Sequence, residues 1–417
     1  MHDLTLRARR PLRIASALFV AAITVYLVVI PAVEMVVGWS RPAPTSQVLE
    51  EMSVLEAVRQ RVIEVAAACW FFYFGATIGS FLNVLVYRMP RGESVIWRRS
   101  RCPACGYAIA GRDNLPILGW LLLGGKCRNC QSAISSRYPW VELTMALMVL
   151  ALYFVELLSG GANIPRREPN AYAGLVWVVF DTKWDLVGLF LIHSFVFAAL
   201  LTWALLVRDG ERIPARSWIL TIGVTAAASW WLPWHPPLLC LPEPVREWRT
   251  TLGHERVTSS LVGLATGVGC ALLVRFLIVG GRRGLERSDI RKAGCAMASL
   301  ALCGAIGGWQ GLLGVVLISL LTLFACLVLL RGTWRSHAGI LAGHVLVGAF
   351  IHQLVWRQLS EGLGRFWPGP ATSWLQACGF VGAISLLAIA SRLVSPPPDQ
   401  LALPDVPHSE GHVESVN

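Results

Sequence analysis

The chain has 417 residues, of which 55% are hydrophobic and 15% charged, and its formal net charge is +11. A soluble domain with this balance would have too little polar surface to cover itself, and the repeated apolar runs of about 20 residues indicate a polytopic membrane protein. The basic residues are concentrated in short loops between these runs and not in a soluble basic domain, which argues against a nucleic-acid-binding role.

The apolar runs predict an all-α polytopic fold with about ten transmembrane helices. They are 14–38, 63–86, 139–158, 186–207, 217–236, 258–280, 294–309, 312–331, 338–356 and 372–393. Only the stretch from Gly307 to Gly311 separates the seventh run from the eighth, so these two also fit one long interrupted helix. The first run follows several arginines and is too long for a cleaved signal peptide, so we expect a retained signal anchor.

The segment 88–137 carries nine basic residues against two acidic ones, which predicts a cytoplasmic loop by the positive-inside rule. With ten alternating spans, the N-terminus and the basic loops 208–216, 281–293 and 332–337 fall on the same side. This loop and the N-terminus are therefore expected on the cytoplasmic side of the membrane, and the resemblance described below implies a bacterial cytoplasmic (inner) membrane.

Four cysteines in that loop have the spacing of a metal site: Cys102, Cys105, Cys127 and Cys130. Each Cys-x-x-Cys turn directs two sulfurs at one point, and two such turns complete the tetrahedron that Zn²⁺ prefers. Redox-active pairs are the alternative, but the cytoplasm keeps thiols reduced, which favours a structural zinc ion. The expected result is a small cytoplasmic four-cysteine zinc-binding loop domain, whose folding depends on the metal.

The stretch from Gly75 to Glu142 contains a series of short motifs. They are Gly79-Ser80-Phe81-x-Asn83-Val84, Tyr87-Arg88-x-Pro90, Cys102-Pro-x-Cys105, Asp113-Asn114-x-Pro116, Cys127-x-x-Cys130 and Ser135-x-Arg137-Tyr138-Pro139-x-Val141-Glu142. Together they closely resemble the N-terminal half of the type IV prepilin peptidases, also called leader peptidase/N-methyltransferases. The resemblance continues more weakly through the membrane half, where Gly304–Gln310 is similar to a Gly-rich turn of that family.

The resemblance implies a bifunctional inner-membrane enzyme of pilus or type II secretion systems. Such an enzyme cleaves the leader of prepilins or pseudopilins and then methylates the new N-terminus with S-adenosylmethionine. The lipid bilayer and these N-terminal segments are the implied partners, and the oligomeric state is left open. Glu142 lies just inside a span, where a charge is usually functional. Pairing with Arg137 or Arg88 is the structural alternative for this residue.

The catalytic half departs from the family pattern. Cleavage in the family uses two aspartates at the cytoplasmic edge of the membrane, one that activates water and one that donates a proton. The corresponding positions are occupied here by Val207 and Ala296, neither of which can hold a proton. Asp209 and Asp289 are the candidate substitutes. The alternative is that both are loop carboxylates that pair with Arg208, Arg212 or Arg291.

Two hypotheses of different class follow. The first is an aspartic-type prepilin endopeptidase and methyltransferase with a relocated aspartate pair; the second is a catalytically degenerate relative that binds pseudopilins or retains methylation only. A transporter is a weaker third. The predicted units are a signal anchor with linker (1–62), a core helix with the zinc knuckle (63–138), a peptidase-like membrane domain (139–356), an extra helix (357–395) and a disordered tail (396–417).

Overall fold

A computed structural model describes residues 54–97, 100–165, 182–231, 253–279, 287–329, 337–363, 366–368 and 372–394. These residues form helices and loops, and the only strand-like pairings among them are two isolated bridges. The longer helices are α3 (Val54–Arg88), α5 (Arg137–Leu152), α7 (Trp184–Arg208), α8 (Ala215–Trp231), α9 (Gly253–Val279), α10 (Arg287–Leu329), α11 (His337–Leu354) and α12 (Trp374–Val394). The short ones are η2 (Met89–Arg91), η3 (Gly111–Asp113), α4 (Leu118–Leu122), η4 (Tyr153–Leu158) and η6 (Gln358–Gly362). The expectation of an all-helical fold is confirmed for this part of the chain.

Six helices in the described part are long and apolar enough to cross a membrane: Arg61–Arg91, Arg137–Leu158, Trp184–Arg208, Val257–Leu277, Ala296–Leu329 and Leu375–Val394. The prediction of about ten spans is not confirmed. The run 14–38 and the tail 396–417 lie outside the described residues. The runs 217–236 and 338–356 correspond to the shorter helices α8 and α11.

The runs 294–309 and 312–331 both lie in α10, which is interrupted at one residue. Gly308 has φ 64° and ψ 178°, a backbone conformation outside the helical region that favours glycine. A neighbouring pair of glycines allows α9 to approach α10 closely: a Cβ added at Gly263 would lie 2.0 Å from the carbonyl oxygen of Gly304. The sequence allowed either two separate spans or one long interrupted helix here, and the structure has the interrupted helix.

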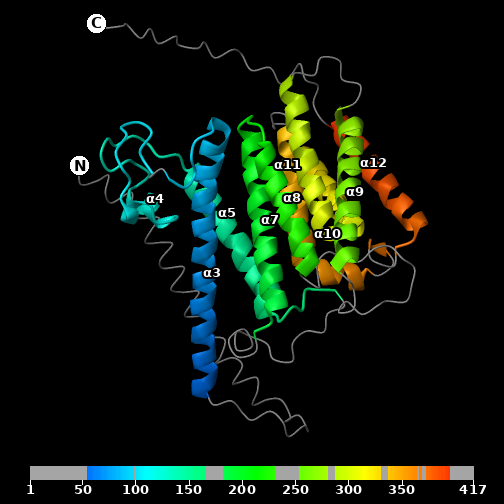
Figure 1. Cartoon of the computed structure of the whole chain (residues 1–417), viewed down its shortest axis with the longest axis horizontal. Helices are drawn as coiled ribbons and strands as arrows, with labels where there is room; N and C mark the ends of the chain where they lie inside the picture. The colour runs from blue at the N-terminus through cyan, green and yellow to red at the C-terminus, as the bar shows by residue number, and fades with distance from the viewer. Residues whose placement is uncertain are drawn as a thin grey trace.

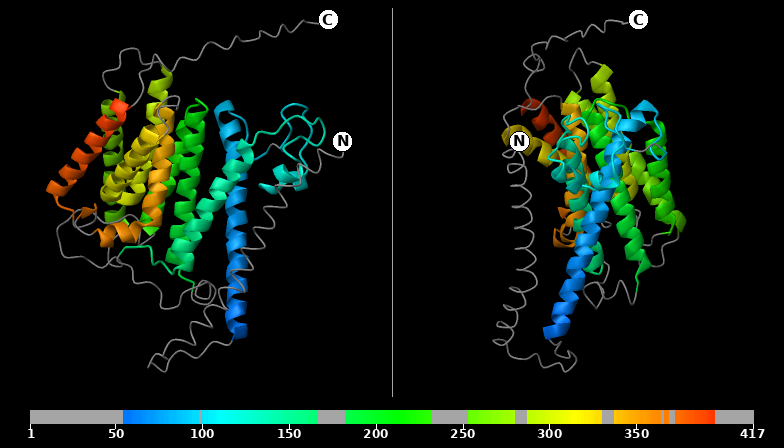
Figure 2. Two further views of the ribbon diagram at one scale, coloured as in Figure 1. Left: turned by 180° about the vertical axis from the view of Figure 1, so that it is seen from behind. Right: turned by 90° about the vertical axis from the view of Figure 1, so that its left-hand side faces the viewer.

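The helices are arranged around α7, which is the most buried of the six candidate spans. Its buried side chains include Trp203 and Leu206, which belong to the main hydrophobic core. Helices α3 and α5 pack against each other along one side, as Figure 1 shows, and α9, α10 and α12 lie on the other. The four-cysteine loop and α4 lie outside α3 and α5, away from α9 and α12, in Figure 1 and in the left-hand view of Figure 2. Among the described helices, this arrangement places the loop next to α3 and α5.

Candidate functional site

The four cysteine thiols predicted to bind metal lie together. Their Sγ atoms are all within 4.8 Å of one another, and those of Cys102 and Cys130 are 3.9 Å apart. Four thiolates around one zinc ion at the usual Zn–S distance of about 2.3 Å have sulfurs separated by about 3.8 Å. The cluster therefore fits a tetrahedral zinc ion with no open ligand position. No disulfide joins these four cysteines.

The two cysteine pairs lie in turns of the same form. In the first, the N–H of Cys102 donates to the carbonyl oxygen of Tyr107, and in the second that of Cys127 donates to Ser132, both at 2.9 Å. The residue after each second cysteine has a positive φ, 70° at Gly106 and 60° at Gln131. The loop thus holds two similar half-sites that point their thiols at one centre.

At two of the four cysteines the surroundings favour the thiolate form, which is the form that binds metal. Backbone N–H groups of Cys105 and Ala104 lower the pKa of Cys102 to about 6. The hydroxyl and backbone N–H of Ser132 likewise lower the pKa of Cys130. These donors would stabilise the sulfur charge of a bound complex without occupying a ligand position. The pKa of Cys105 is instead raised: a backbone hydrogen bond from Tyr107 lowers it, but burial and the side chains of Cys130 and Cys102 outweigh that effect.

Two further contacts join the segment between the two cysteine turns to the second turn and to the residues that follow it. Arg128 makes a two-pronged ion pair with Asp113, with distances of 2.8 and 2.6 Å, and this guanidinium lowers the pKa of the Asp113 carboxyl. The indole N–H of Trp120 donates to the carbonyl oxygen of Ile134 at 3.0 Å. Such contacts supplement the metal in a domain that has few core residues.

The motif residue Glu142 fastens this domain to the spans. Its buried carboxylate accepts the backbone N–H of Ile117 at 2.6 Å and a hydrogen bond from Ser80 on α3. A Cβ added at Gly79 would lie 2.6 Å from the Glu142 Cα, so the small residue allows α3 and α5 to touch there. The expected pairing of Glu142 with Arg137 or Arg88 is wrong: a backbone amide and a hydroxyl satisfy the carboxylate instead.

Other motif residues make structural contacts at the same junction. The amide of Asn83 donates to the carbonyl oxygen of Tyr138 at 3.2 Å, which again joins α3 to α5. The guanidinium of Arg88 donates to the carbonyl oxygen of Ser94 just beyond the end of α3. Pro139 lies in the first turn of α5, where its missing N–H breaks no helical hydrogen bond.

Arg137 contacts one of the two candidate catalytic carboxylates. Its guanidinium lies 2.7 Å from Oδ1 of Asp209 at the C-terminal end of α7, and both side chains are about one-third exposed. The alternative to a catalytic role for Asp209 was a pairing with Arg208, Arg212 or Arg291, but the partner found comes from α5. The backbone of Asp289 lies in the first turn of α10, while its side chain lies outside the described part.

The two positions that the resemblance predicts to correspond to the family's aspartates make apolar contacts in the structure. Val207 is 1% exposed and packs against Ala342, with Ala204 and Ile213 beside them. Ala296 is also buried, at 3% exposure. The space next to Val207 is thus filled by hydrocarbon from α7, α11 and the loop between α7 and α8.

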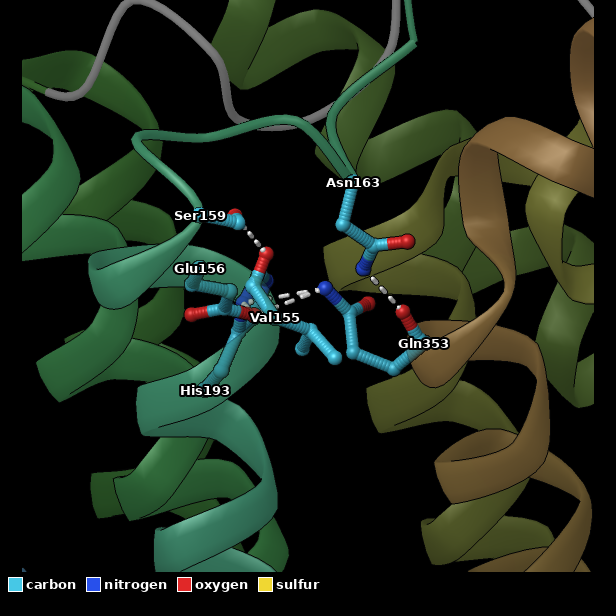
Figure 3. Close-up of polar contacts among 6 residues, drawn as sticks. All are labelled: Val155, Glu156, Ser159, Asn163, His193 and Gln353. Carbon is cyan, nitrogen blue, oxygen red and sulfur yellow. Dashed lines mark hydrogen bonds and ion pairs between the residues drawn. The ribbon is translucent and has the colours of Figure 1, made fainter. Parts of the chain in front are cut away.

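Sequence reasoning missed a second polar cluster, drawn in Figure 3. Glu156 is fully buried in η4, and its Oε1 lies 2.7 Å from Nδ1 of His193 and 2.9 Å from the amide nitrogen of Gln353. The amide of Asn163 donates to the backbone carbonyl of Gln353. The signal available was a glutamate at the end of an apolar run, but the partners lie on α7 and α11, far away in sequence.

The geometry defines a class: a multi-pass membrane protein with a four-cysteine cluster, able to hold a metal ion, between two neighbouring spans. Residues 73–155 match the bacterial peptidase A24 N-terminal domain family, so this part of the chain is similar to domains of that type. The chain is 46% identical over 84 residues to a prepilin leader peptidase/N-methyltransferase of Myxococcus xanthus. It is 44% identical over 106 residues to a type 4 prepilin-like proteins leader peptide-processing enzyme of Escherichia coli. A prepilin leader peptidase/N-methyltransferase of Klebsiella pneumoniae is also 44% identical, over 102 residues.

These matches cover only part of this chain and of each relative. They cover 20%, 21% and 22% of this chain and 25%, 39% and 45% of the three relatives, in the order given. No solved structure matches the chain. The resemblance to prepilin peptidases is thus confirmed for the domain that holds the metal centre.

Proposed function

We propose that the protein binds the N-terminal segments of prepilin-like or pseudopilin-like proteins and does not cleave them with the family's aspartate pair. The A24-type domain supports the binding part, since it matches proteins named for processing such segments. The observation that carries the second part is the apolar packing of Val207 and Ala342, with Val207 only 1% exposed.

The chemical reason is direct. Hydrolysis by a carboxylate dyad needs one ionised group to activate water and one protonated group to donate to the scissile carbonyl. The methyl groups of Val207 and Ala296 do neither. The Asp209 carboxylate contacts the Arg137 guanidinium at 2.7 Å, which suits it to hold α5 and α7 together.

A second candidate is leader cleavage by Asp209 together with Asp289. It is favoured by the place of Asp209 at the end of α7, where its carboxylate is 30% exposed, and by the place of Asp289 in the first turn of α10. On this proposal both carboxylates lie at the predicted cytoplasmic edge of the membrane, and Arg137 would release Asp209 when substrate binds.

Two groups belong to the proposal. A zinc ion would be held by Cys102, Cys105, Cys127 and Cys130 and would supply folding free energy to the loop. A role for S-adenosylmethionine follows only from the family resemblance. In a relative that has lost cleavage, N-methylation is the activity of the family that remains.

Mass spectrometry of a purified prepilin incubated with the detergent-solubilised protein tests both proposals. We expect complex formation, measured by crosslinking, with the leader retained. Leader removal that Asp209→Asn abolishes and Glu211→Gln leaves intact would replace the binding proposal with the relocated pair. Failure to crosslink any prepilin-like N-terminus would overturn the proposed partner class.

The double variant Val207→Asp/Ala296→Asp provides an independent check of the correspondence with the family positions. If these positions face each other as in a dyad, the variant gains leader cleavage that each single substitution lacks. Cleavage by a single variant would show that the two positions do not act as a pair.

A further inference from the structure

The short helix α4 of the four-cysteine domain exposes two leucines on one side. Leu118 is 46% exposed and Leu122 is 64% exposed, and residues four apart in a helix lie on the same face. A flank of α4 is held by the close contact of Gly119, where an added Cβ would lie 2.3 Å from the Asp113 carbonyl oxygen. The orientation of the leucine face is therefore fixed by the fold of the domain.

The contacts of Ile117 place the start of α4 beside apolar parts of the spans. The Ile117 N–H binds the carboxylate of Glu142, which is buried within the candidate span Arg137–Leu158 and also contacts Ser80. Ser80 lies eight residues before Arg88, the last residue of α3, or about 12 Å along the helix axis. Figures 1 and 2 agree that α4 lies alongside α3 and does not extend beyond its end.

Exposed cationic side chains lie in the same domain. Arg101, Arg112 and Lys126 are exposed. The carboxylate of Asp113 is paired with Arg128 and also lies near Arg112, so the cations of residues 100–136 outnumber their one carboxylate. Basic groups at the surface of a bilayer bind anionic headgroups, and a neighbouring apolar face lies in the boundary between headgroups and acyl chains.

We propose that α4 is an interfacial anchor that holds the four-cysteine domain against an anionic phospholipid bilayer. Leu118 and Leu122 enter the headgroup–acyl boundary of the leaflet that contains the C-terminal end of α3 and the N-terminal end of α5. Arg101, Arg112 and Lys126 contact its phosphates. The leucine face of α4 is continuous with the membrane spans, and the exposed cations lie in the same domain. The proposed anchor does not depend on whether the protein binds or cleaves prepilins.

Fluorescence quenching in lipid nanodiscs tests the anchor. A fluorescent noncanonical residue is placed at Leu122 or, as control, at Ala104, an exposed position in the first cysteine turn. Nanodiscs contain phosphatidylcholine and phosphatidylglycerol with brominated acyl chains. We expect quenching at position 122 to exceed that at position 104 by about threefold or more, as for an apolar face within the acyl boundary. Equal quenching at both positions would overturn the proposal.

Aqueous iodide distinguishes lipid from a protein that covers the same face. Protection of position 122 from iodide without quenching by brominated lipid would show that a partner protein or a second copy covers α4, and would overturn the lipid assignment. Replacing the anionic lipid by phosphatidylcholine alone should raise iodide access at position 122, and an unchanged value would overturn the role of the cations.

A charge-introducing variant completes the test. Leu118→Glu/Leu122→Glu should reduce brominated-lipid quenching of a reporter at Leu115 to the level seen at position 104, whereas Ala104→Glu should not. Zinc content by elemental analysis verifies that each variant domain is folded. Unchanged quenching in a zinc-loaded double variant would contradict the anchor.

Discussion

At the scale of single residues, the contact between Glu142 and Ile117 explains why an acidic residue sits inside an apolar span. Ile117 has φ 62° and ψ −53°, and the N–H of Leu118 donates to the carbonyl oxygen of Pro116 at 2.6 Å, which together form a γ-turn of the rare hand. A β-branched residue seldom adopts positive φ. The strained turn leaves the Ile117 N–H pointing at the Glu142 carboxylate.

The first prediction concerns this carboxylate. Glu142→Ala should destabilise the protein by about 1–3 kcal/mol, because the buried Ile117 N–H loses its acceptor. Glu142→Gln keeps an acceptor oxygen and should cost clearly less. Thermal unfolding in detergent measures both, and equal losses for the two variants would show that the charge, and not the hydrogen bond, is what matters.

The second prediction concerns the buried pair Glu156–His193. His193→Ala leaves the buried Glu156 carboxyl group with Gln353 as its partner and should lower the free energy of unfolding by about 1–3 kcal/mol, the usual cost of an unsatisfied buried polar group. The double variant Glu156→Gln/His193→Gln replaces both groups of the contact with neutral amides. It should recover much of the loss in the same unfolding assay, and a double variant as unstable as His193→Ala would contradict the pairing.

At the scale of elements, sequence patterns predicted what is local. The Cys-x-x-Cys turns were predicted correctly because two ligands three residues apart define a turn by themselves. The spans now seen as α3, α5, α7, α9 and α12 follow from continuous apolar runs. The partners of Glu142, Asp209 and Glu156 were not predictable, because each comes from a different helix or loop whose facing side depends on packing. The sequence showed the break at Gly308 only as a glycine-rich stretch, which fitted either two separate spans or one interrupted helix.

The third prediction concerns the metal and the elements around it. Chelation should increase hydrogen exchange across residues 100–136, since four thiols within 4.8 Å lose the cation that holds them. Exchange in α7 should not change, because its core contacts do not involve the loop. Cys127→Ser should reproduce the effect, and Cys270→Ser, at a buried cysteine outside the cluster, is the matched control. An exchange pattern unaffected by chelation would rule out a folding role for metal.

At the scale of the whole molecule, the A24-type domain and the rest of the membrane region differ in how far their function can be inferred. The former matches relatives at 44–46% identity. The latter contains Val207 and Ala296 where the family resemblance expects carboxylates. Contacts such as Arg137–Asp209 join the two parts. The part that matches these relatives is thus joined to a membrane region in which Val207 and Ala296 are buried apolar residues.

The fourth prediction is the orientation of the molecule. The excess of basic residues in the segment 88–137 should keep the four-cysteine domain on the cytoplasmic side. A protease site introduced at Gly111, where an added side chain meets no atom within 4 Å, should be cut in inside-out vesicles and protected in right-side-out ones. The reverse pattern would invert the topology and remove the basis for a leader-binding role.

The two half-sites of the metal centre also bear on how the protein is made. Helix α3 ends at Arg88 and α5 begins at Arg137, so a long stretch of chain separates these two helices. A metal ion that joins Cys102 to Cys130 replaces most of that path with one short bridge. Each halving of a loop lowers its closure cost by about 0.6 kcal/mol. Metal loading during synthesis would therefore favour the pairing of these two helices as soon as α5 enters the bilayer, before the remaining spans exist.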